Sequence, residues 1–283
     1  MNVLLVRNPP EDTPDRYHQH LQSIGLHPHS VPVLETVYAN LGDLRDKVQE
    51  KSSGYGGVIM TSSRSAESWD LIRDELSSAR RDGMGSSDWS SVPFYTVGTA
   101  TGNILRKMPV SPFTPSSQNI VGEGSGAGEA LAKVIIDDQR GRTPKLPLLY
   151  LVGDKNKDTL PTLVQAAGLD LEPLQVYSTR GSPSFSTAVK ALFQRRLPLD
   201  PTRWWIVFFA PSSAEFALPI LREHLAFSPV DESGDDQYGQ FCKVAAIGPT
   251  TVTHVKGKCG VKVHAVAEKP SPKALGEALL EFG

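Results

Sequence analysis

The chain has 283 residues but only two cysteines, and it has no apolar run near the roughly 18 residues that a membrane-spanning helix needs. Cys242 and Cys259 are too few for a disulfide framework, and neither has metal-ligand spacing, so we expect both to be reduced, in a reducing compartment. A formal net charge of −2 leaves no basic surface of the kind that binds a phosphate backbone. These absences predict a cytoplasmic protein whose partners include neither a membrane nor a nucleic acid.

Signatures of common enzyme sites are also missing. The sequence contains no P-loop and no Gly-x-Ser-x-Gly, His-Glu-x-x-His or Cys/His nucleophile pattern, which argues against a triad hydrolase. The pair His18 and His20 falls in a predicted helix, where side chains two residues apart diverge, so we expect no metal site. The glycine run 122–126 follows a Pro- and Ser-rich loop instead of a strand, so it does not fit a dinucleotide-binding fingerprint.

What the sequence does contain is a duplication, in the order A, B, A′, B′. Unit A repeats without a gap and unit B repeats at three short segments; the matched pairs are 25–34 with 168–177, 57–67 with 206–215, 97–101 with 247–251, and 128–131 with 276–279. The length is ordinary for two domains of about 140 residues each. We therefore expect two similar domains, and a cleft between such domains is a common ligand site.

Short apolar runs alternate with segments of helical periodicity. Strands buried on both faces belong to parallel sheets covered by helices, so the pattern predicts an α/β fold. The expected strands are Val3–Val6, Val58–Met60, Phe94–Val97, Leu148–Val152, Ile206–Phe209 and Val244–Ile247. The expected helices are Asp15–Ile24, Ala66–Glu75, Ala100–Lys107, Leu160–Ala167, Ala214–Leu225 and Lys273–Phe282. Polar surface loops are expected at 77–91 and 228–240.

Two short segments, residues 30–37 and 174–180, close units A and A′ and are equivalent by the repeat. If they pair with each other, they form a two-stranded connector, and each domain then combines units from both halves of the chain. The sequence alone leaves open whether A joins B and A′ joins B′, or whether the pairing is crossed.

Four predicted strands run directly into polar residues that start a helix. These residues are Thr61, Ser62, Ser63 and Arg64; Gly98, Thr99 and Thr101; Ser212 and Ser213; and Gly248, Pro249, Thr250 and Thr251. They could be no more than helix caps. However, ligands bind at the carboxyl ends of parallel strands, and helix N-termini present free N–H groups to anions. Four such ends at duplicated positions favour a site for an anionic ligand, with carboxylates preferred because no P-loop is present.

Tyr177 is the most suggestive single residue, because its repeat partner is Leu34. A phenol can donate a proton or a hydrogen bond, although its usual pKa of about 10 makes it a weak acid. It could equally be a tyrosine that packs beside the connector. Arg64 and Lys243 are charges near strand ends that could pair with ligand carboxylates or be solvated surface charges.

Taken together, these segments resemble the uroporphyrinogen-III synthase family of haem (tetrapyrrole) biosynthesis. The residues that carry the resemblance are Met1 to Arg7, Tyr55 to Arg64, Val97 to Thr101, Val176 to Thr179, Phe208 to Ser212 and Ala245 to Thr251. The motifs are short, but their order and spacing are specific, and they cover nearly the whole chain. Ser63 and Ala210 depart from the family pattern, in which Pro and Ser often stand at these positions.

The resemblance implies two flavodoxin-like domains, 1–33 with 181–283 and 38–173, joined by the two-stranded connector, with the active site in the cleft. It implies a monomeric, cofactor-free lyase that cyclises the linear tetrapyrrole hydroxymethylbilane, with loss of water and inversion of ring D, to uroporphyrinogen III. Tyr177 matches the family's Val-Tyr position and is the candidate donor to the leaving hydroxyl. The alternative is a non-catalytic two-domain sensor that binds an anionic small molecule.

Overall fold

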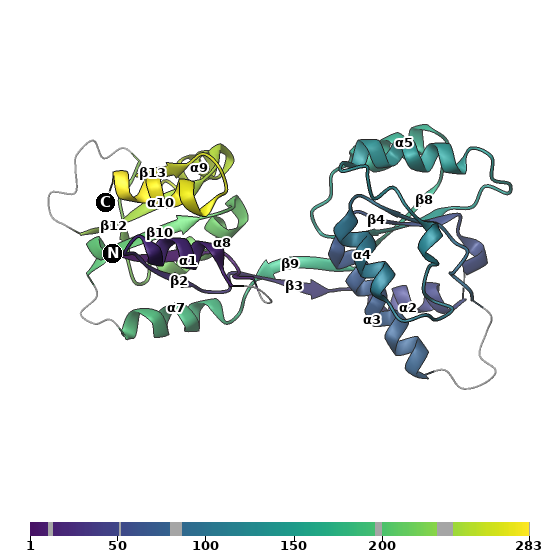
Figure 1. Ribbon diagram of the computed structural model, residues 1–283, viewed down its shortest axis with the longest axis horizontal. Helices are drawn as coiled ribbons and strands as arrows, with labels where there is room; N and C mark the ends of the chain where they lie inside the picture. The colour runs from purple at the N-terminus through teal and green to yellow at the C-terminus, as the bar shows by residue number, and fades with distance from the viewer. Residues whose placement is uncertain (11–13, 51, 80–86, 196–199, 231–239, 283) are drawn as a thin grey trace. The chain divides into compact units, whose positions relative to one another are not determined.

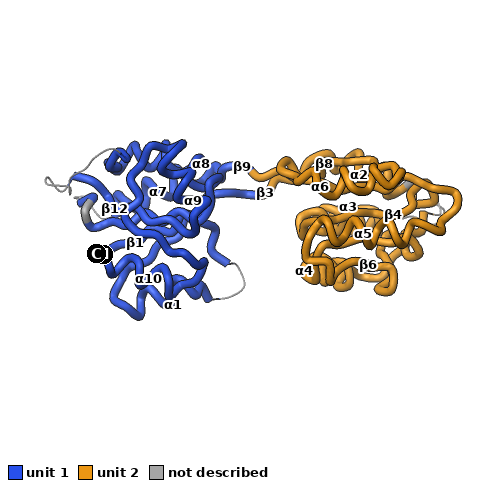
Figure 2. Tube along the Cα trace, turned by 90° about the horizontal axis from the view of Figure 1, so that it is seen from above, with its two compact units in different colours: residues 1–35, 180–283 blue, residues 36–179 orange. Residues whose placement is uncertain are grey.

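The computed structural model describes residues 1–10, 14–50, 52–79, 87–195, 200–230 and 240–282 (Figure 1). The chain forms two compact units, unit 1 from residues 1–35 and 180–283 and unit 2 from residues 36–179 (Figure 2). Most of the two loops expected at 77–91 and 228–240 lies outside the described residues, at 80–86 and 231–239. Residues 77–79 are the last residues of a helix instead.

Unit 1 is built around a six-stranded sheet of parallel pairs. Its strands are β1 (Asn2–Val6), β2 (His27–Ser30), β10 (Trp204–Phe208), β11 (Ala226–Phe227), β12 (Phe241–Ile247) and β13 (Ala265–Ala267). The order is β13-β12-β10-β1-β2, and β11 pairs with the first residues of β12. β1 and β10 lie in the middle and are almost wholly apolar, as strands buried on both faces must be.

Helices cover both faces of this sheet. One face packs on α7 (Phe185–Gln194), α8 (Pro211–Leu221) and α9 (Pro249–Gly257), and the other on α1 (Arg16–Ser23) and α10 (Pro272–Glu281). Alternate residues of β1 point to opposite cores: Leu4 and Val6 to the first, Val3 and Leu5 to the second. The continuous apolar runs of the sequence thus arise from two separate cores.

Unit 2 has the same layers. Its parallel sheet has the order β6-β5-β4-β7-β8, with strands β4 (Gly57–Met60), β5 (Phe94–Thr96), β6 (Ile120–Val121), β7 (Leu148–Val152) and β8 (Leu171–Gln175). One face packs on α2 (Leu41–Glu50), α3 (Ser63–Ala79) and α4 (Thr99–Lys107). The other packs on α5 (Gly128–Gln139) and α6 (Thr159–Ala166).

Each sheet mixes strands from both copies of the duplication. β1 and β2 come from A and pair with β10 to β13 of B′, whereas β4 to β6 come from B and pair with β7 and β8 of A′. In unit 1 the order of strands along the chain is 2-1-3-4-5, apart from the short β11, which is the flavodoxin-like order. The α/β class and the parallel sheets expected from the sequence are therefore confirmed.

A separate two-stranded sheet joins β3 (Leu34–Tyr38) and β9 (Tyr177–Gly181), which lie side by side in Figure 1. Both strands begin at the repeat partners Leu34 and Tyr177. The two-stranded connector is thus present, but it starts later than predicted at 30 and 174. The reason is that residues 171–175 pair along β7 and residue 30 pairs with β1, so both still belong to the large sheets.

Candidate functional site

The predicted strand ends lie beside each other in pairs. In unit 2, β4 and β5 are neighbours and Met60 pairs with Thr96, so Thr61 to Arg64 lies beside Gly98 to Thr101. In unit 1, β10 and β12 are neighbours and Phe208 pairs with Ala246. This brings the segment around Ser212 next to Gly248 and Pro249. Each unit therefore presents two adjacent helix N-termini at the carboxyl edge of its sheet.

Four of the helices that start at these edges have an N-cap residue without a side-chain oxygen, whereas α3 is capped by the Ser62 hydroxyl, which accepts from the Arg64 N–H over 3.2 Å. The N-cap residues of α4, α5, α8 and α9 are Gly98, Ala127, Ala210 and Gly248. Glycine and alanine have no side-chain oxygen to accept a bond from the first free N–H groups, so these groups stay available to an anion. Thr99, Ser212 and Thr250 lie within the first helical turn instead of at the cap. The simple capping role is therefore wrong for these three residues.

Unit 2 has a cavity of about 490 Å³ at its carboxyl edge. It lies at the end of β4 and β7, where the strand order reverses, which is where doubly wound sheets bind ligands. Three predicted site residues line it: Thr61, Ser62 and Tyr177. The other lining residues were not predicted as site residues; they are Val97, Gly126, Ala127, Gly128, Glu129, Tyr150, Lys155, Asn156, Lys157, Thr159 and Leu160.

The charges around this cavity favour an anion. Lys155 and Lys157 are exposed, and neither forms an ion pair with any residue in the described ranges. The one acidic side chain of the lining, Glu129, lies 3.1 Å from the amino group of Lys133 and is neutralised there. Lys155, Lys157 and the uncapped N-terminus of α5 all line the cavity. The cavity can therefore accept carboxylates.

Two phenols line the same cavity. Tyr150 is 4 % exposed, and burial raises the pKa of its phenol; a side-chain hydrogen bond with Thr61 opposes this rise, while Tyr177 and Asp158 add to it. Tyr150 is therefore protonated and neutral at physiological pH. The Tyr177 side chain is half-buried, and its hydroxyl makes no hydrogen bond to another residue within the described part of the chain. It is free to donate to a bound molecule.

Several predicted residues lie away from this cavity. Ser63 begins α3, and the Nε atom of Arg64 donates to the Thr36 hydroxyl over 2.6 Å, which directs Arg64 to β3. Thr101 and Thr251 are buried, at 5 % and 3 % exposure, and each is the third residue of its helix. Because they are enclosed by protein, they cannot contact a ligand directly. Ser213, also 5 % exposed, is buried in the same way.

Lys243 was expected next to a strand end, but it lies within β12, which begins at Phe241 and not at Val244. It pairs with Trp205 in the first half of this strand. Its Nζ atom donates to the Phe282 carbonyl over 2.8 Å and lies 5.6 Å from the Trp205 ring centroid. Lys243 therefore belongs to the opposite edge of the sheet from Gly248.

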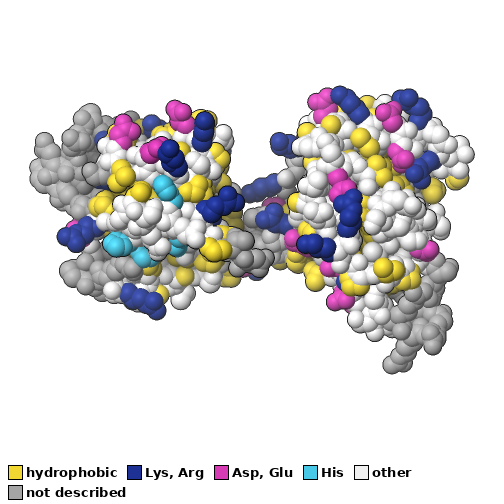
Figure 3. Space-filling model, viewed as in Figure 1, with side chains coloured by type: hydrophobic (Ala, Val, Ile, Leu, Met, Phe, Trp, Pro, Cys, Tyr) yellow, Lys and Arg dark blue, Asp and Glu magenta, His cyan; other side chains and the backbone are white. Residues whose placement is uncertain are grey.

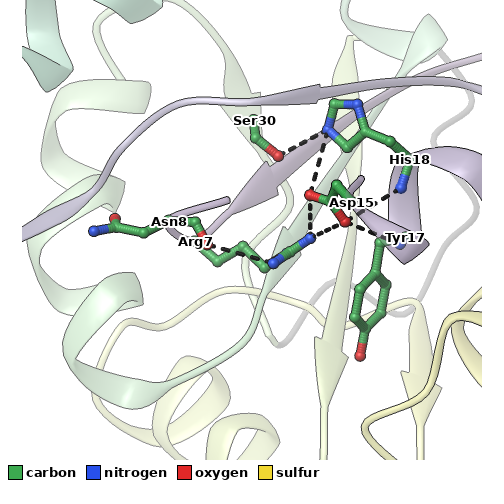
Figure 4. Close-up of polar contacts among 6 residues, drawn as sticks. All are labelled: Arg7, Asn8, Asp15, Tyr17, His18 and Ser30. Carbon is green, nitrogen blue, oxygen red and sulfur yellow. Dashed lines mark hydrogen bonds and ion pairs between the residues drawn. The ribbon is translucent and has the colours of Figure 1, made fainter. Parts of the chain in front are cut away.

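Unit 1 has a cavity of about 470 Å³ at the corresponding place, lined by the loops that follow β1 and precede α10. Arg7 follows β1 directly and forms an ion pair with Asp15, whose carboxylate also caps α1 by accepting from the Tyr17 N–H over 2.9 Å (Figure 4). Its guanidinium lies 4.7 Å from the Tyr17 ring and 5.1 Å from the Phe209 ring. The sequence analysis missed Arg7, although a charge directly after a buried strand was a signal.

A third cavity, of about 600 Å³, lies at the amino edge of the unit 2 sheet. It is lined by Ser52, Tyr55, Gln139 and Arg142 among others, but by none of the predicted site residues. Arg142 is already paired with Asp138 over 3.0 Å. Since this cavity is at the opposite end of the strands from the uncapped helix starts, we assign the site to the carboxyl edge.

Comparison with known proteins identifies the family. The family model described as uroporphyrinogen-III synthase HemD matches residues 15–277, which is nearly the whole chain. The chain belongs to the uroporphyrinogen-III synthase family. The resemblance inferred from the strand-end motifs is thereby confirmed.

Two curated relatives carry the name uroporphyrinogen-III synthase. The protein from Schizosaccharomyces pombe is 28 % identical over 269 residues, covering 95 % of this chain and 92 % of its own. The protein from Saccharomyces cerevisiae is 28 % identical over 293 residues, covering 99 % and 95 %. The solved structure of uroporphyrinogen-III synthetase from Helicobacter pylori has a TM-score of 0.52 and 16 % identity, covering 100 % of this chain and 99 % of its own. At this level of identity, the likeness to the Helicobacter pylori structure supports a shared fold and nothing about function.

Among the described residues there is no cluster of three His, Cys, Asp or Glu side chains that could hold a metal ion, and no helix long and apolar enough to cross a membrane. On the face shown in Figure 3, basic and acidic side chains lie near one another on each unit and do not gather by sign.

Proposed function

We propose that this chain is a uroporphyrinogen-III synthase that cyclises hydroxymethylbilane to uroporphyrinogen III. The observation that carries the proposal is the family match over residues 15–277. In this reaction the linear tetrapyrrole loses water and its last ring is inverted, which makes the enzyme a lyase. The cytoplasmic location and the monomeric state expected from the sequence stay predictions.

The carboxyl edge of unit 2 supports this function by its chemistry. Substrate and product carry eight carboxylates, as the family resemblance implies, and they need several dispersed anion-binding groups. Lys155, Lys157, the Ser62 hydroxyl and the uncapped start of α5 supply such groups around one cavity. In unit 1, the starts of α8 and α9 supply further free N–H groups. We propose that each of these edges can bind carboxylates.

Tyr177 is the proposed donor to the leaving hydroxyl. When the carbon–oxygen bond of the hydroxymethyl group breaks, the electron pair stays on oxygen, and a proton or hydrogen bond from the phenol allows water to leave. The linear substrate also closes spontaneously, but to the wrong isomer, so the larger task is to hold it in one conformation. A weak acid is sufficient for such a task. No observation favours the alternative of a non-catalytic anion sensor.

The isomer of the product tests the proposed function. Freshly made hydroxymethylbilane is incubated with the protein, the products are oxidised, and the porphyrin isomers are separated. We expect the type III isomer to dominate with native protein and the type I isomer with heat-denatured protein. Type I product in both reactions would refute the assignment.

Replacing Tyr177→Phe should lower kcat by about 10- to 100-fold, because one hydrogen bond to developing charge is worth roughly 1.5–3 kcal/mol. KM should change little, since the ring and its packing remain. The matched control is Tyr55→Phe, which removes a buried phenol that donates to Glu172 over 2.8 Å at the other edge of the sheet. Equal turnover of Tyr177→Phe and wild type would remove this residue from the mechanism.

Removing both Lys155 and Lys157 should raise KM by about 2- to 30-fold, because each exposed ion pair with a carboxylate contributes about 0.2–1 kcal/mol. The increase should shrink as salt is added, because salt screens exposed charges. Lys145→Ala, which removes an exposed charge before the start of β7, is the control. A KM that is unchanged at low ionic strength would place the substrate carboxylates elsewhere.

A further inference from the structure

The Tyr177 ring packs directly against the backbone of Gly153. A Cβ atom added to Gly153 would lie 2.5 Å from Cζ and 2.7 Å from the hydroxyl oxygen of Tyr177. No side chain fits at this distance, and the phenol end of the ring would have to move. Gly153 follows β7 directly, so the end of a rigid central strand forms the surface on which the phenol lies.

Asn156 holds that surface in place. Its Oδ1 atom accepts from the Gly153 N–H over 3.2 Å, and its Nδ2 atom donates to the Gly153 carbonyl over 2.6 Å. The first bond fixes the peptide group before the glycine and the second fixes the peptide group after it. Because glycine is the residue with the greatest backbone freedom, these two bonds restrict a segment that would otherwise be mobile.

The backbone on either side of Tyr177 is tied to the same loop. The Val176 N–H donates to the Val152 carbonyl over 2.9 Å, and the Thr179 N–H donates to the Asp154 carboxylate over 3.1 Å. These bonds fix where the Tyr177 side chain starts. The contact with Gly153 then limits where its hydroxyl points.

The duplication supplies a comparison within the molecule. By strand register Leu5 corresponds to Tyr150, so Asn8, three residues on, corresponds to Gly153. In unit 1 the Asn8 side chain occupies this place and accepts from the Leu34 N–H over 3.2 Å. In unit 2 the position has no side chain, and the phenol fills the space. The change from leucine to tyrosine thus accompanies the change from asparagine to glycine.

We propose that Gly153 and Asn156 are positioning residues that aim the Tyr177 phenol into the cavity of unit 2. This proposal rests on the proposed function, in which Tyr177 donates to the leaving hydroxyl. Gly153 provides the contact surface, and Asn156 keeps that surface at a constant distance from the ring. Neither residue needs to touch the reacting atoms.

A double-mutant cycle tests the proposal in the full-length protein. Gly153→Ala should lower kcat by about 10- to 100-fold, as Tyr177→Phe does, with KM within about twofold of wild type. In the Tyr177→Phe background the same change should lower kcat less than about twofold, because residues that act through one group are not additive. Asn156→Ala should behave in the same way with a smaller effect, and it replaces Gly153→Ala if that variant does not fold. If Gly153→Ala lowered kcat by the same factor in the wild-type and the Tyr177→Phe protein, the proposal would be overturned.

The control is Gly42→Ala, at a position where an added Cβ meets nothing within 4 Å. It should leave kcat and KM unchanged.

A spectroscopic measurement separates this proposal from the proposed function. With tyrosine labelled by 13C at Cζ, the Tyr177 signal is the one that disappears in Tyr177→Phe. We expect this signal to shift or broaden in Gly153→Ala and Asn156→Ala and to stay unchanged in Gly42→Ala. An unchanged signal in both variants would refute the positioning role even in an active enzyme. Type I product from wild-type protein would refute the proposed function. Even then, the 13C signal of Tyr177 would show whether Gly153 and Asn156 hold the phenol in place.

Discussion

The structure depends on the parallel pairing of strands from different copies of the duplication. β1 pairs with β10 in one sheet and β7 pairs with β4 in the other, and each of these strands is buried on both faces. Burial of two continuous apolar strands side by side is a large hydrophobic gain that a single copy could not obtain alone. Once these pairs form, the carboxyl ends of the central strands and the starts of the following helices must meet at one edge. The cavity of unit 2 is a consequence of that geometry.

The duplication also shows how one scaffold acquired two different edges. In unit 1 the cation after β1, Arg7, is paired with Asp15 and enclosed by two aromatic rings, so much of its charge is used within the protein. In unit 2 the loop after β7 carries Lys155 and Lys157 without such partners among the described residues. The two connector strands also differ in a functional group, because β3 begins with Leu34 and β9 begins with Tyr177. The proposed donor and the two lysines therefore lie where the copies differ, whereas the strands and the helix starts that follow them are shared by both copies.

Much of the fold was predictable because apolar runs and turn residues act locally. All six expected strands and all six expected helices are present, with ends shifted by a few residues. The ends of α3 and α8 are each shifted by four residues. The helix α8 ends at Leu221 instead of Leu225 because the apolar pattern continues through the turn that follows it. Helices such as α7 were not predicted, although Phe185, Val189 and Phe193 repeat at helical spacing.

The site was predictable only in part, because it depends on contacts between distant segments. Thr61, Ser62 and Tyr177 share one cavity. The signal for the first two was a polar motif at a strand end, and the signal for Tyr177 was the difference from its repeat partner Leu34. Lys155 and Asn156 follow a predicted strand as well, but surface lysines and asparagines are common and the repeat contains no matching pair. Lys243 was expected beside a strand end because the predicted strand started at Val244; the strand begins three residues earlier, so Lys243 lies within it, in its amino-terminal half.

The proposed function depends on binding of the substrate carboxylates at the carboxyl edge of the sheets. Hydrogen exchange of the protein, measured with and without uroporphyrinogen III, tests this placement. We expect the product to slow exchange at the start of α5, at Ser62 to Ser65 and at Lys155 to Thr159. Slower exchange confined to the amino-edge cavity, at Ser52 to Gly56 and at Gly141 to Leu146, would contradict it.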